Sequence, residues 1–240
     1  MLQLIGRFLR AGVILPEGCH VRSTEGTPQG GPLSPLLANI YLDQLDKELE
    51  KRKLKHVRYA DDCNIYVVSE SEANAVLQSI SQWISRKLKL QINTDKSGIG
   101  RVWERKFLGF ILTAGLLITV SPQAIARFKD QVRSQWDARQ SLSSEQLRDQ
   151  WSAYQRGWWA YYRRAEERRS ITGLSGWIRR HIRKCFWQRW HSASGRRAAL
   201  ARLGIPPSRL RTAHSSHGAW RMGRHPVLKR YGFITPSDLV

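Results

Sequence analysis

The chain has 240 residues and carries 40 lysines and arginines against 19 acidic residues, a formal net charge of +21. This length suits one large domain or two small ones. Such an excess of positive charge points to a polyanionic partner, with nucleic acid before an anionic membrane, although a merely solvated basic surface is the simpler alternative. No apolar run reaches the roughly 18 residues of a membrane-spanning helix, which predicts no membrane span.

The cysteines favour a reducing, cytoplasmic setting. Cys19, Cys63 and Cys185 are few, odd in number and widely spaced, so they form neither a disulfide framework nor a zinc knuckle. His214 and His217 have a metal-like spacing, but no cysteine or acidic residue lies close to them in sequence. We therefore do not expect zinc to bind there.

Charge and aromatic residues are unevenly distributed. Residues 1–120 carry 16 lysines and arginines against 12 acidic residues, whereas residues 121–240 carry 24 against 7. Eight of the ten tryptophans also lie in the second half. This asymmetry predicts two domains with different roles, residues 1–120 and 121–240, with a boundary near Ser121 and Pro122.

The first region begins with apolar residues at helical spacing, which predict a short helix that ends near Gly12. A loop rich in Gly, Thr and Pro follows. Ser34 and Pro35 then have the character of an N-cap and a first-turn proline, and they predict a helix from about residue 35 to 50. The residues that we expect this helix to bury are Leu37, Ile40, Tyr41 and Leu45.

Beyond residue 50 the pattern alternates between strands and helices. β-Forming residues at 57–60 and 63–68 predict a hairpin with Asp61 and Asp62 at its turn. A helical pattern over 72–88 follows, then a short strand, and then a second hairpin that turns at Ala114 and Gly115. This order predicts the α+β class, with an antiparallel sheet backed by helices.

From Ser121 onward the pattern is helical, with helices expected over 122–136, 145–164 and 174–190. Four aromatic residues recur on one face of the second of these helices: Trp151, Tyr154, Trp158 and Tyr162. Because large aromatic residues at helical spacing usually face inward, we interpret this stripe as core packing rather than as a binding surface. The last fifty residues are basic and rich in loops.

The adjacent aspartates at the hairpin turn need an explanation, because neighbouring like charges repel each other. Two carboxylates at one edge of a sheet can hold divalent cations beside a phosphate. Adjacent residues of a strand point to opposite faces, so Asp61 and Asp62 need not serve equally. Aspartate also favours turns, and an isolated pair is more often a solvated turn than a metal site.

This pair is not isolated. Tyr59-Ala60-Asp61-Asp62 follows GTPQGGPLSPLLANIYLDQLD and precedes a lysine-bearing strand and FLGFIL, and the second half contains QWSAYQRGWWAYYRRA and LSGWIRRHIRKCFWQRW. In this order the segments closely resemble the bacterial group II intron-encoded reverse transcriptase/maturases, over essentially the whole chain. The resemblance implies a partial reverse-transcriptase palm at residues 1–120, followed by a helical thumb, or maturase, region at 121–240 with a basic tail.

The resemblance also implies an activity and roles for individual residues. The activity is that of an RNA-directed DNA polymerase that binds group II intron RNA and extends a DNA primer on an RNA template with dNTPs, using Mg²⁺. The implied catalytic residues are Asp61, Asp62 and Lys96, of which the two aspartates are the metal ligands. The residues implied to contact the nucleotide and template are Pro28, Gln29, Gly30, Tyr59 and Ala60. The residues that match the primer grip are Phe107, Leu108, Gly109 and Phe110.

Each of these segments also has an ordinary alternative. The PQG loop is equally suited to be a tight turn before a helix, Lys96 to be an exposed lysine, and the FLGF segment to be core. In the helical region, arginines interleaved with aromatic residues can contact phosphates and unpaired bases. Our candidates for RNA binding are Arg156, Arg163, Arg164, Arg179, Arg180 and Arg183.

One feature departs from the family pattern. A complete enzyme of this kind should carry a further aspartate on a separate strand, many tens of residues before the PQG loop. Only 27 residues precede Pro28, and their acidic residues, Glu17 and Glu25, do not lie in strand-like runs. We therefore expect an incomplete two-ion Mg²⁺ site in the C-terminal portion of a reverse transcriptase, inactive in polymerisation alone unless an upstream fragment supplies the fingers and this aspartate.

Two other functions remain open at this point. The chain could be an RNA-binding maturase remnant that assists intron splicing without making DNA, or a non-functional relic of a mobile element. No Cys/His-rich segment follows residue 190, so we expect no endonuclease module.

Overall fold

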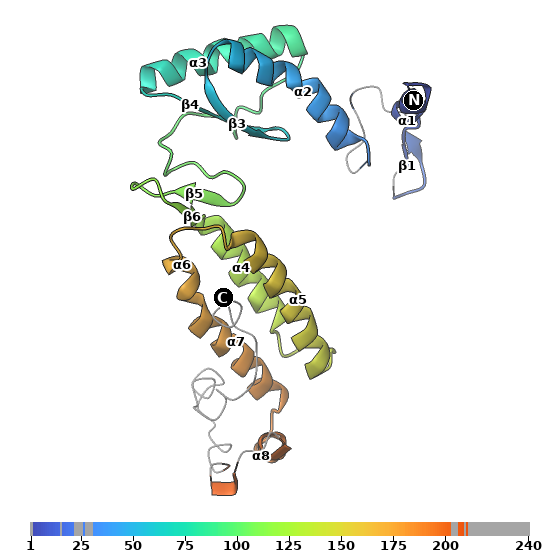
Figure 1. Cartoon of the computed structure of the whole chain (residues 1–240). Coiled ribbons are helices and arrows are strands. Elements are labelled where there is room, and N and C mark those ends of the chain that lie inside the picture. The colour runs from blue at the N-terminus through green and yellow to red at the C-terminus, as the bar shows by residue number, and fades with distance from the viewer. Residues whose placement is uncertain are drawn as a thin grey trace. The chain divides into compact units, whose positions relative to one another are not determined.

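The computed structural model describes residues 2–14, 16–21, 26, 31–202, 206–208 and 210. The chain divides into two compact units, residues 1–100 and 101–240 (Figure 1). The N-terminal unit is coloured from blue to green, and the C-terminal unit from green to red. In the described part of the chain, no helix is both long and apolar enough to cross a bilayer.

The described residues of the first unit form three α-helices, a π-helical turn and two short hairpins. In chain order these elements are α1 (Leu2–Arg10), β1 (Val13–Ile14), β2 (His20–Val21), α2 (Ser34–Lys51), β3 (Lys55–Tyr59), β4 (Asp62–Tyr66), α3 (Glu70–Trp83) and η1 (Ile84–Leu88). Helices α2 and α3 lie on the same side of the β3–β4 hairpin (Figure 1). The hairpin and the helices before and after it confirm the order predicted from the sequence.

The core of the first unit is small. Its buried members come from α2, α3 and η1, and Cys63 and Ile65 of β4 pack against them. They are Leu45, Leu49, Ile80 and Leu88. The inward and outward alternation of β3 gives the hairpin one face toward this core, as the period of a strand requires.

Several details of the first unit differ from the sequence prediction. Leu33, not Ser34, is the N-cap of α2, and it makes no side-chain cap. Ile40 and Tyr41 are 62% and 43% exposed, because the buried residues of α2 are Leu45 and Leu49, further along the helix. The prediction of a short strand after α3 is also wrong, because no strand forms among the described residues 89–100. The π-turn ends at Lys89 in a left-handed conformation (φ 55°), and turns follow.

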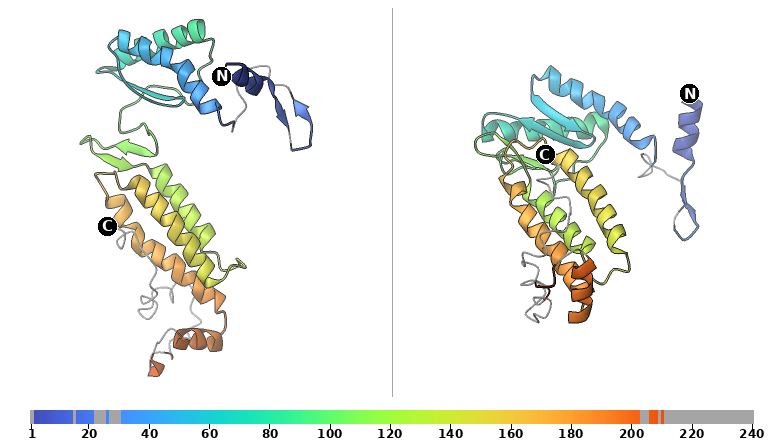
Figure 2. Two further views of the ribbon diagram at one scale, coloured as in Figure 1. Left: turned by 45° about the vertical axis from the view of Figure 1, so that its right-hand side comes forward. Right: turned by 60° about the horizontal axis from the view of Figure 1, so that its bottom comes forward.

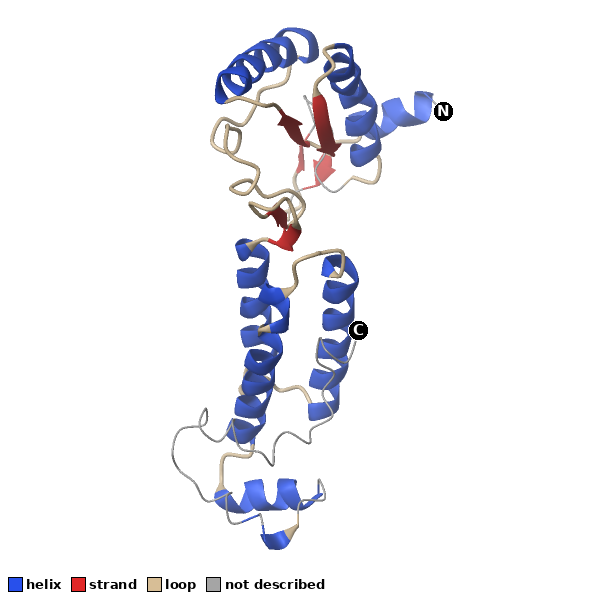
Figure 3. Cartoon of the chain, turned by 60° about the vertical axis from the view of Figure 1, so that its left-hand side comes forward, coloured by secondary structure: helices blue, strands red, loops and turns tan. Residues whose placement is uncertain are grey.

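The second unit contains a hairpin followed by helices. Its elements are β5 (Phe110–Leu112), β6 (Ile118–Val120), α4 (Pro122–Gln135), α5 (Ser144–Tyr162), α6 (Arg169–Thr172), α7 (Leu174–Arg189) and α8 (Ala193–Arg202). The long helices α4, α5 and α7 run side by side (Figures 2 and 3). The second hairpin turns at Ala114 and Gly115, as predicted, and the three long helices confirm the predicted bounds to within two residues at each end.

Local signals explain where these helices begin. The Ser121 hydroxyl accepts a hydrogen bond from the Ala124 N–H, and Pro122 occupies the first turn of α4. At α5, Ser143 and Gln146 form a reciprocal capping box. The starts of α4 and α5 are therefore encoded in a few adjacent residues.

The core of the second unit is large and aromatic. Ten buried residues, contributed mainly by α4, α5 and α7, form one cluster. Trp151 is fully buried between Phe128 and Trp136, with ring centroids 6.0 and 6.1 Å away. The aromatic stripe of α5 is therefore core packing, as predicted, with Tyr154 and Trp158 partly buried at its edge.

The α+β class is confirmed, although the described residues form three separate two-stranded antiparallel sheets and not one continuous sheet. The compact units divide at Gly100, about twenty residues before the domain boundary inferred from composition. That functional boundary near Ser121 stays a prediction. The β5–β6 hairpin belongs with the helices because Phe110 packs against Tyr162, and Val120 lies in the same cluster.

Candidate functional site

The two aspartates lie at the tip of the β3–β4 hairpin. Tyr59 pairs with Asp62 as the last rung of the ladder, so Ala60 and Asp61 form the connection. Ala60 adopts a left-handed conformation, with φ of 54°. Both carboxylates are exposed, and Tyr59 beside them is 63% exposed. This exposure by itself suits a solvated turn as well as a ligand pair.

Arg58, at an inward-facing position of β3, holds this turn in place. Arg58 Nε and Nη2 donate to the two carboxylate oxygens of Asp46 on α2, at 2.7 and 2.5 Å. Its Nη1 donates to Asn39 Oδ1 on the same helix at 3.0 Å and to the Ala60 carbonyl at 2.8 Å. One guanidinium therefore ties the turn to α2, through the forked geometry that suits arginine. We call Arg58, Asp46, Asn39 and Ala60 the turn clamp.

The clamp also shifts the protonation equilibria of its members. The hydrogen bond from Arg58 lowers the pKa of Asp46, although partial burial opposes this shift. The same hydrogen bond raises the pKa of Arg58. Both shifts favour the charged pair, so the clamp is ionised at any physiological pH.

Sequence reasoning missed this clamp. Arg58 lies at an inward position of β3, where an apolar residue is the usual choice. Asn39 and Asp46 are seven residues apart on α2, which places them on one face of that helix. An inward arginine opposite an acidic residue on a helical face is the signal that could have identified it.

The other candidates of the first unit lie elsewhere. Lys96 is exposed in a turn, where the side chain of Asn93 accepts hydrogen bonds from the Asp95 and Lys96 N–H groups. The PQG residues Pro28, Gln29 and Gly30 lie outside the described residues. Of the first-unit candidates, the structure therefore brings together only Tyr59, Ala60, Asp61 and Asp62 within the part that it describes.

The predicted primer-grip residues form a tight turn in the second unit. Phe107 and Phe110 exchange two backbone hydrogen bonds, each of 2.9 Å, across Leu108 and Gly109. Both residues between them are left-handed, with φ of 52° and 80°. This conformation favours glycine and costs energy at Leu108.

The end of α5 holds this turn. Tyr161 Oη donates to the Leu108 carbonyl at 2.9 Å. A Cβ at Gly109 would lie 2.5 Å from Tyr162 Oη, so no larger residue fits there without displacing Tyr162. The rings of Tyr161 and Tyr162 also pack on Phe110, at 5.6 and 5.2 Å between centroids.

The six candidate RNA-binding arginines lie on or next to α5 and α7. All are exposed except Arg180 and Arg183, which are half-buried. Arg183 has its pKa lowered by burial and by the nearby charges of Arg179 and Arg180. Arg179, Arg180 and Arg183 therefore concentrate positive charge on α7, and a bound anion would reduce the repulsion among them.

Sequence reasoning missed a second group of cations, which crosses from α4 to α7. Lys129 Nζ and Arg133 Cζ lie 5.8 and 5.4 Å from the centre of the Trp177 ring. Trp177 also packs on His181, with ring centroids 4.0 Å apart. The signal in the sequence was the spacing of Lys129 and Arg133, which places both on one face of a helix.

Asp61 and Asp62 supply carboxylate oxygens, the ligand type that Mg²⁺ prefers. Within the described ranges, no group of three or more His, Cys, Asp or Glu side chains could hold a metal ion. The described residues therefore fit a two-ion site only in part.

Each of the two units contains a segment that matches a known protein-family model. Residues 4–112 match the family model described as "Reverse transcriptase (RNA-dependent DNA polymerase)". Residues 125–204 match the model "Group II intron, maturase-specific domain". The first match contains the aspartate turn and the primer-grip turn, and the second contains α5, α7 and most of α4.

Curated relatives agree with this assignment. The chain is 53% identical to the group II intron-encoded protein LtrA of Lactococcus lactis subsp. cremoris over 24% of this chain and 10% of that protein. It is 35% identical to the putative COX1/OXI3 intron 2 protein of Saccharomyces cerevisiae over 45% of this chain and 20% of that protein. It is 28% identical to protein YkfC of Escherichia coli K12 over 49% of this chain and 38% of that protein.

The two family matches define a reverse-transcriptase region joined to a maturase-specific region. The chain belongs to the group II intron reverse transcriptase/maturase family, as the sequence motifs predicted. Its alignments span well under half the length of the curated relatives, between 10% and 38% of each.

Proposed function

We propose that the helical unit of this chain binds group II intron RNA, and that the aspartate turn is part of a Mg²⁺-dependent nucleotidyl-transfer site. The observation that supports RNA binding most directly is the gathering of arginines and lysines on α4, α5 and α7, in a segment that matches a maturase-specific domain. Phosphate contacts of this kind favour RNA over an uncharged partner.

In this proposal each part of the first unit has a separate task. Asp61 and Asp62 would provide Mg²⁺ ligands, and the metal would supply charge stabilisation at the nucleotide phosphates. Arg58 keeps the turn that carries them in one conformation. Tyr59 and Ala60, beside the aspartates, would face the nucleotide, and Lys96 would offset charge on the leaving group. In the second unit, the Phe107–Phe110 turn would position the primer end.

The proposal includes an expected lack of activity. Two carboxylates cannot complete a two-ion site, and no third one joins them among the described residues. We therefore propose that this 240-residue chain does not extend a DNA primer by itself, and that another polypeptide segment must supply the third ligand. An RNA-binding role in splicing without DNA synthesis is the second candidate, and the same absence of a third ligand favours it.

Primer extension tests the polymerase part. The purified chain, with poly(rA), oligo(dT), dTTP and Mg²⁺, is expected to give no extension product. Incorporation that Asp61→Asn abolishes would show that the chain carries a complete site, and the proposed dependence on another segment would then be wrong.

Salt dependence tests the RNA-binding part. The affinity for a folded intron RNA should fall steeply between about 50 and 200 mM salt, because phosphate contacts release counterions. The double variant Arg179→Gln/Arg180→Gln should weaken binding and reduce the slope of log K against log salt by about 2. Arg148→Gln, an exposed arginine of α5 outside the candidate set, is the matched control. A flat salt response would contradict this part of the proposal.

A further inference from the structure

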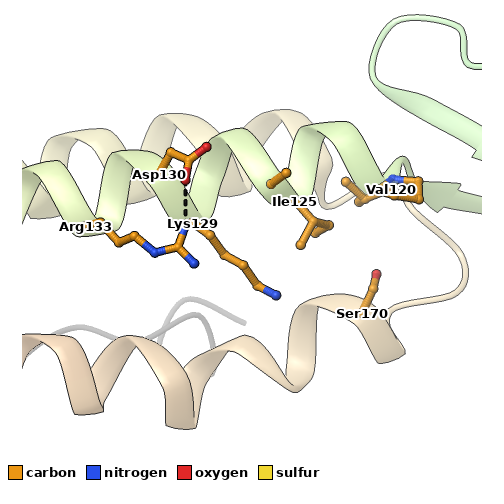
Figure 4. A pocket seen from close by; sticks show the side chains of 8 residues that line it. Val120, Ile125, Lys129, Asp130, Arg133 and Ser170 are labelled. Carbon is orange, nitrogen blue, oxygen red and sulfur yellow. Dashed lines mark hydrogen bonds and ion pairs between the residues drawn. The ribbon is translucent and has the colours of Figure 1, made fainter. Parts of the chain in front are cut away.

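A cavity of about 430 Å³ lies between α4 and α6 in the second unit. Its walls from β6 and α4 are largely apolar, and they consist of Val120, Pro122, Ile125 and Ala126. Lys129 and Arg133 lie toward one end of the cavity, and Ser170 of α6 lies toward the other end, across from Ile125 and Val120 (Figure 4). The volume lies within the usual range of small-molecule sites, about 300–1,000 Å³.

The charges at this cavity favour an anion at the Lys129 end. Asp130 is the single carboxylate among the lining residues; it lies 2.5 Å from Arg133 Nη1 and points away from Ser170 (Figure 4). Lys129 has no carboxylate partner among the ion pairs of the described residues. Its ammonium group instead contacts the face of Trp177, which holds it in place without neutralising it.

We propose that this cavity binds one unpaired nucleotide of an RNA strand, with the base against Ile125 and Ala126 and the phosphate between Lys129 and Arg133. The proposal rests on the proposed RNA-binding function and assigns one contact of that RNA to α4. Ser170 would donate or accept a hydrogen bond at the sugar or the base edge.

The arrangement suits a nucleotide better than an acidic peptide. Apolar walls next to two cations match a flat base joined to a phosphate, and proteins that bind single strands combine these two elements. The strong positive charge of the second half also gathers polyanions of high charge density. An acidic peptide with one apolar side chain is the competing ligand, and the experiment includes it.

The probe is adenosine 5′-monophosphate, and the measurement is NMR titration of the full 240-residue chain. AMP should shift the indole signal of Trp177 and the methyl signals of Ile125. Adenosine should bind several-fold more weakly, because it lacks the phosphate. Lys129→Met should weaken AMP binding about tenfold, since a charge-assisted contact is lost.

A second variant blocks the cavity without changing its charge. Ala126 is exposed on α4 and lines the cavity, so Ala126→Phe should fill the space for the base and abolish AMP binding. Ala153→Phe, at an exposed position of α5, is the matched control and should bind AMP like the wild type. Retained binding by Ala126→Phe, or equal affinities for AMP and adenosine, would overturn the proposal.

The same proteins separate this inference from the proposed function. If wild-type protein binds folded intron RNA with a steep salt dependence but AMP shifts neither Trp177 nor Ile125, the cavity proposal is wrong and RNA binding stands. If no RNA binds, both proposals fail. A glutamate- and leucine-containing hexapeptide that displaces AMP and binds more tightly would assign the cavity to a protein partner and overturn the proposal.

Discussion

The two units are stabilised in different ways. Among the described residues of the first unit, four buried side chains form the core, and the conformation of the aspartate turn depends on a hydrogen-bonded arginine. In the second unit, ten buried residues, four of them tryptophan or phenylalanine, form the main core, and the arginines lie on its outside. In the first unit, one set of hydrogen bonds from Arg58 thus positions the aspartate turn. In the second unit, a packed aromatic core positions the helices that carry the arginines.

The largest effect should come from breaking the scaffold. Trp151→Ala removes a fully buried indole between Phe128 and Trp136, and it should lower the free energy of unfolding of the second unit by about 3–5 kcal/mol. Chemical denaturation followed by tryptophan fluorescence and hydrogen exchange would measure this loss. Trp103→Ala, at a 40% exposed position, is the control. Equal losses in the two variants would contradict the packing described.

A smaller effect should follow from breaking the turn clamp. Asp46→Ala leaves the Arg58 side chain, which is only 12% exposed, without its carboxylate partner. The first unit should lose about 2 kcal/mol, the scale of a charge-assisted hydrogen bond, and hydrogen exchange should increase at Ala60 and Asp61. Asp43→Ala, on the same helix but in an exposed pair with Lys47, should change neither quantity.

The scaffold also contains a position where a substitution should stabilise it. Gln155 is 1% exposed, and neither atom of its side-chain amide has a hydrogen-bond partner within the described structure. Gln155→Met keeps the approximate shape and removes the buried amide, so the second unit should gain about 1 kcal/mol. Denaturant titration would measure the gain, with Gln131→Met at an exposed position of α4 as control. A loss of stability would show that this amide is satisfied.

The smallest effect concerns pH. Burial lowers the pKa of His181 from its usual 6.5, and the charges of Lys184, Arg133 and Arg180 lower it further, while a backbone hydrogen bond at Trp177 opposes the shift. As pH falls through 6.5, His181 binds a proton in the unfolded chain before it does so in the folded chain. Stability should therefore decrease as pH falls toward the folded pKa of His181.

Comparing variants isolates this contribution. Thermal unfolding between pH 5 and 7.5 should depend less on pH in His181→Gln than in the wild type. Gln188→Ala, at an exposed position of the same helix, should keep the wild-type dependence. Parallel pH profiles for the wild type and His181→Gln would contradict the assigned shift.

The sequence predicted the features that depend on neighbouring residues. The starts of α4 and α5 lie within one residue of the positions predicted from the helical pattern, and the buried stripe of α7 follows from its period, with Ile178, Ile182 and Phe186 all buried. The family was also predictable, because its motifs are contiguous. For the same reason the position of Asp61 and Asp62 at a hairpin turn was predicted to within one residue.

The sequence could not predict contacts between distant residues. The clamp joins Arg58 to residues 12 and 19 positions away, and the contact between Lys129 and Trp177 spans 48 positions. Ile40 was predicted to be buried and is exposed. The period of α2 indicated an inward face, but the packing partners of that helix lie along Leu45 and Leu49, so Ile40 stays exposed.

The close approach of Gly109 to Tyr162 has an evolutionary consequence. Because a side chain at position 109 and the hydroxyl at position 162 would occupy the same space, neither residue can be exchanged without regard to the other. Among homologous proteins, the two positions should vary together: a residue larger than glycine at the first should accompany a residue smaller than tyrosine at the second. A covariation signal between residues 53 positions apart would then record the attachment of this turn to α5.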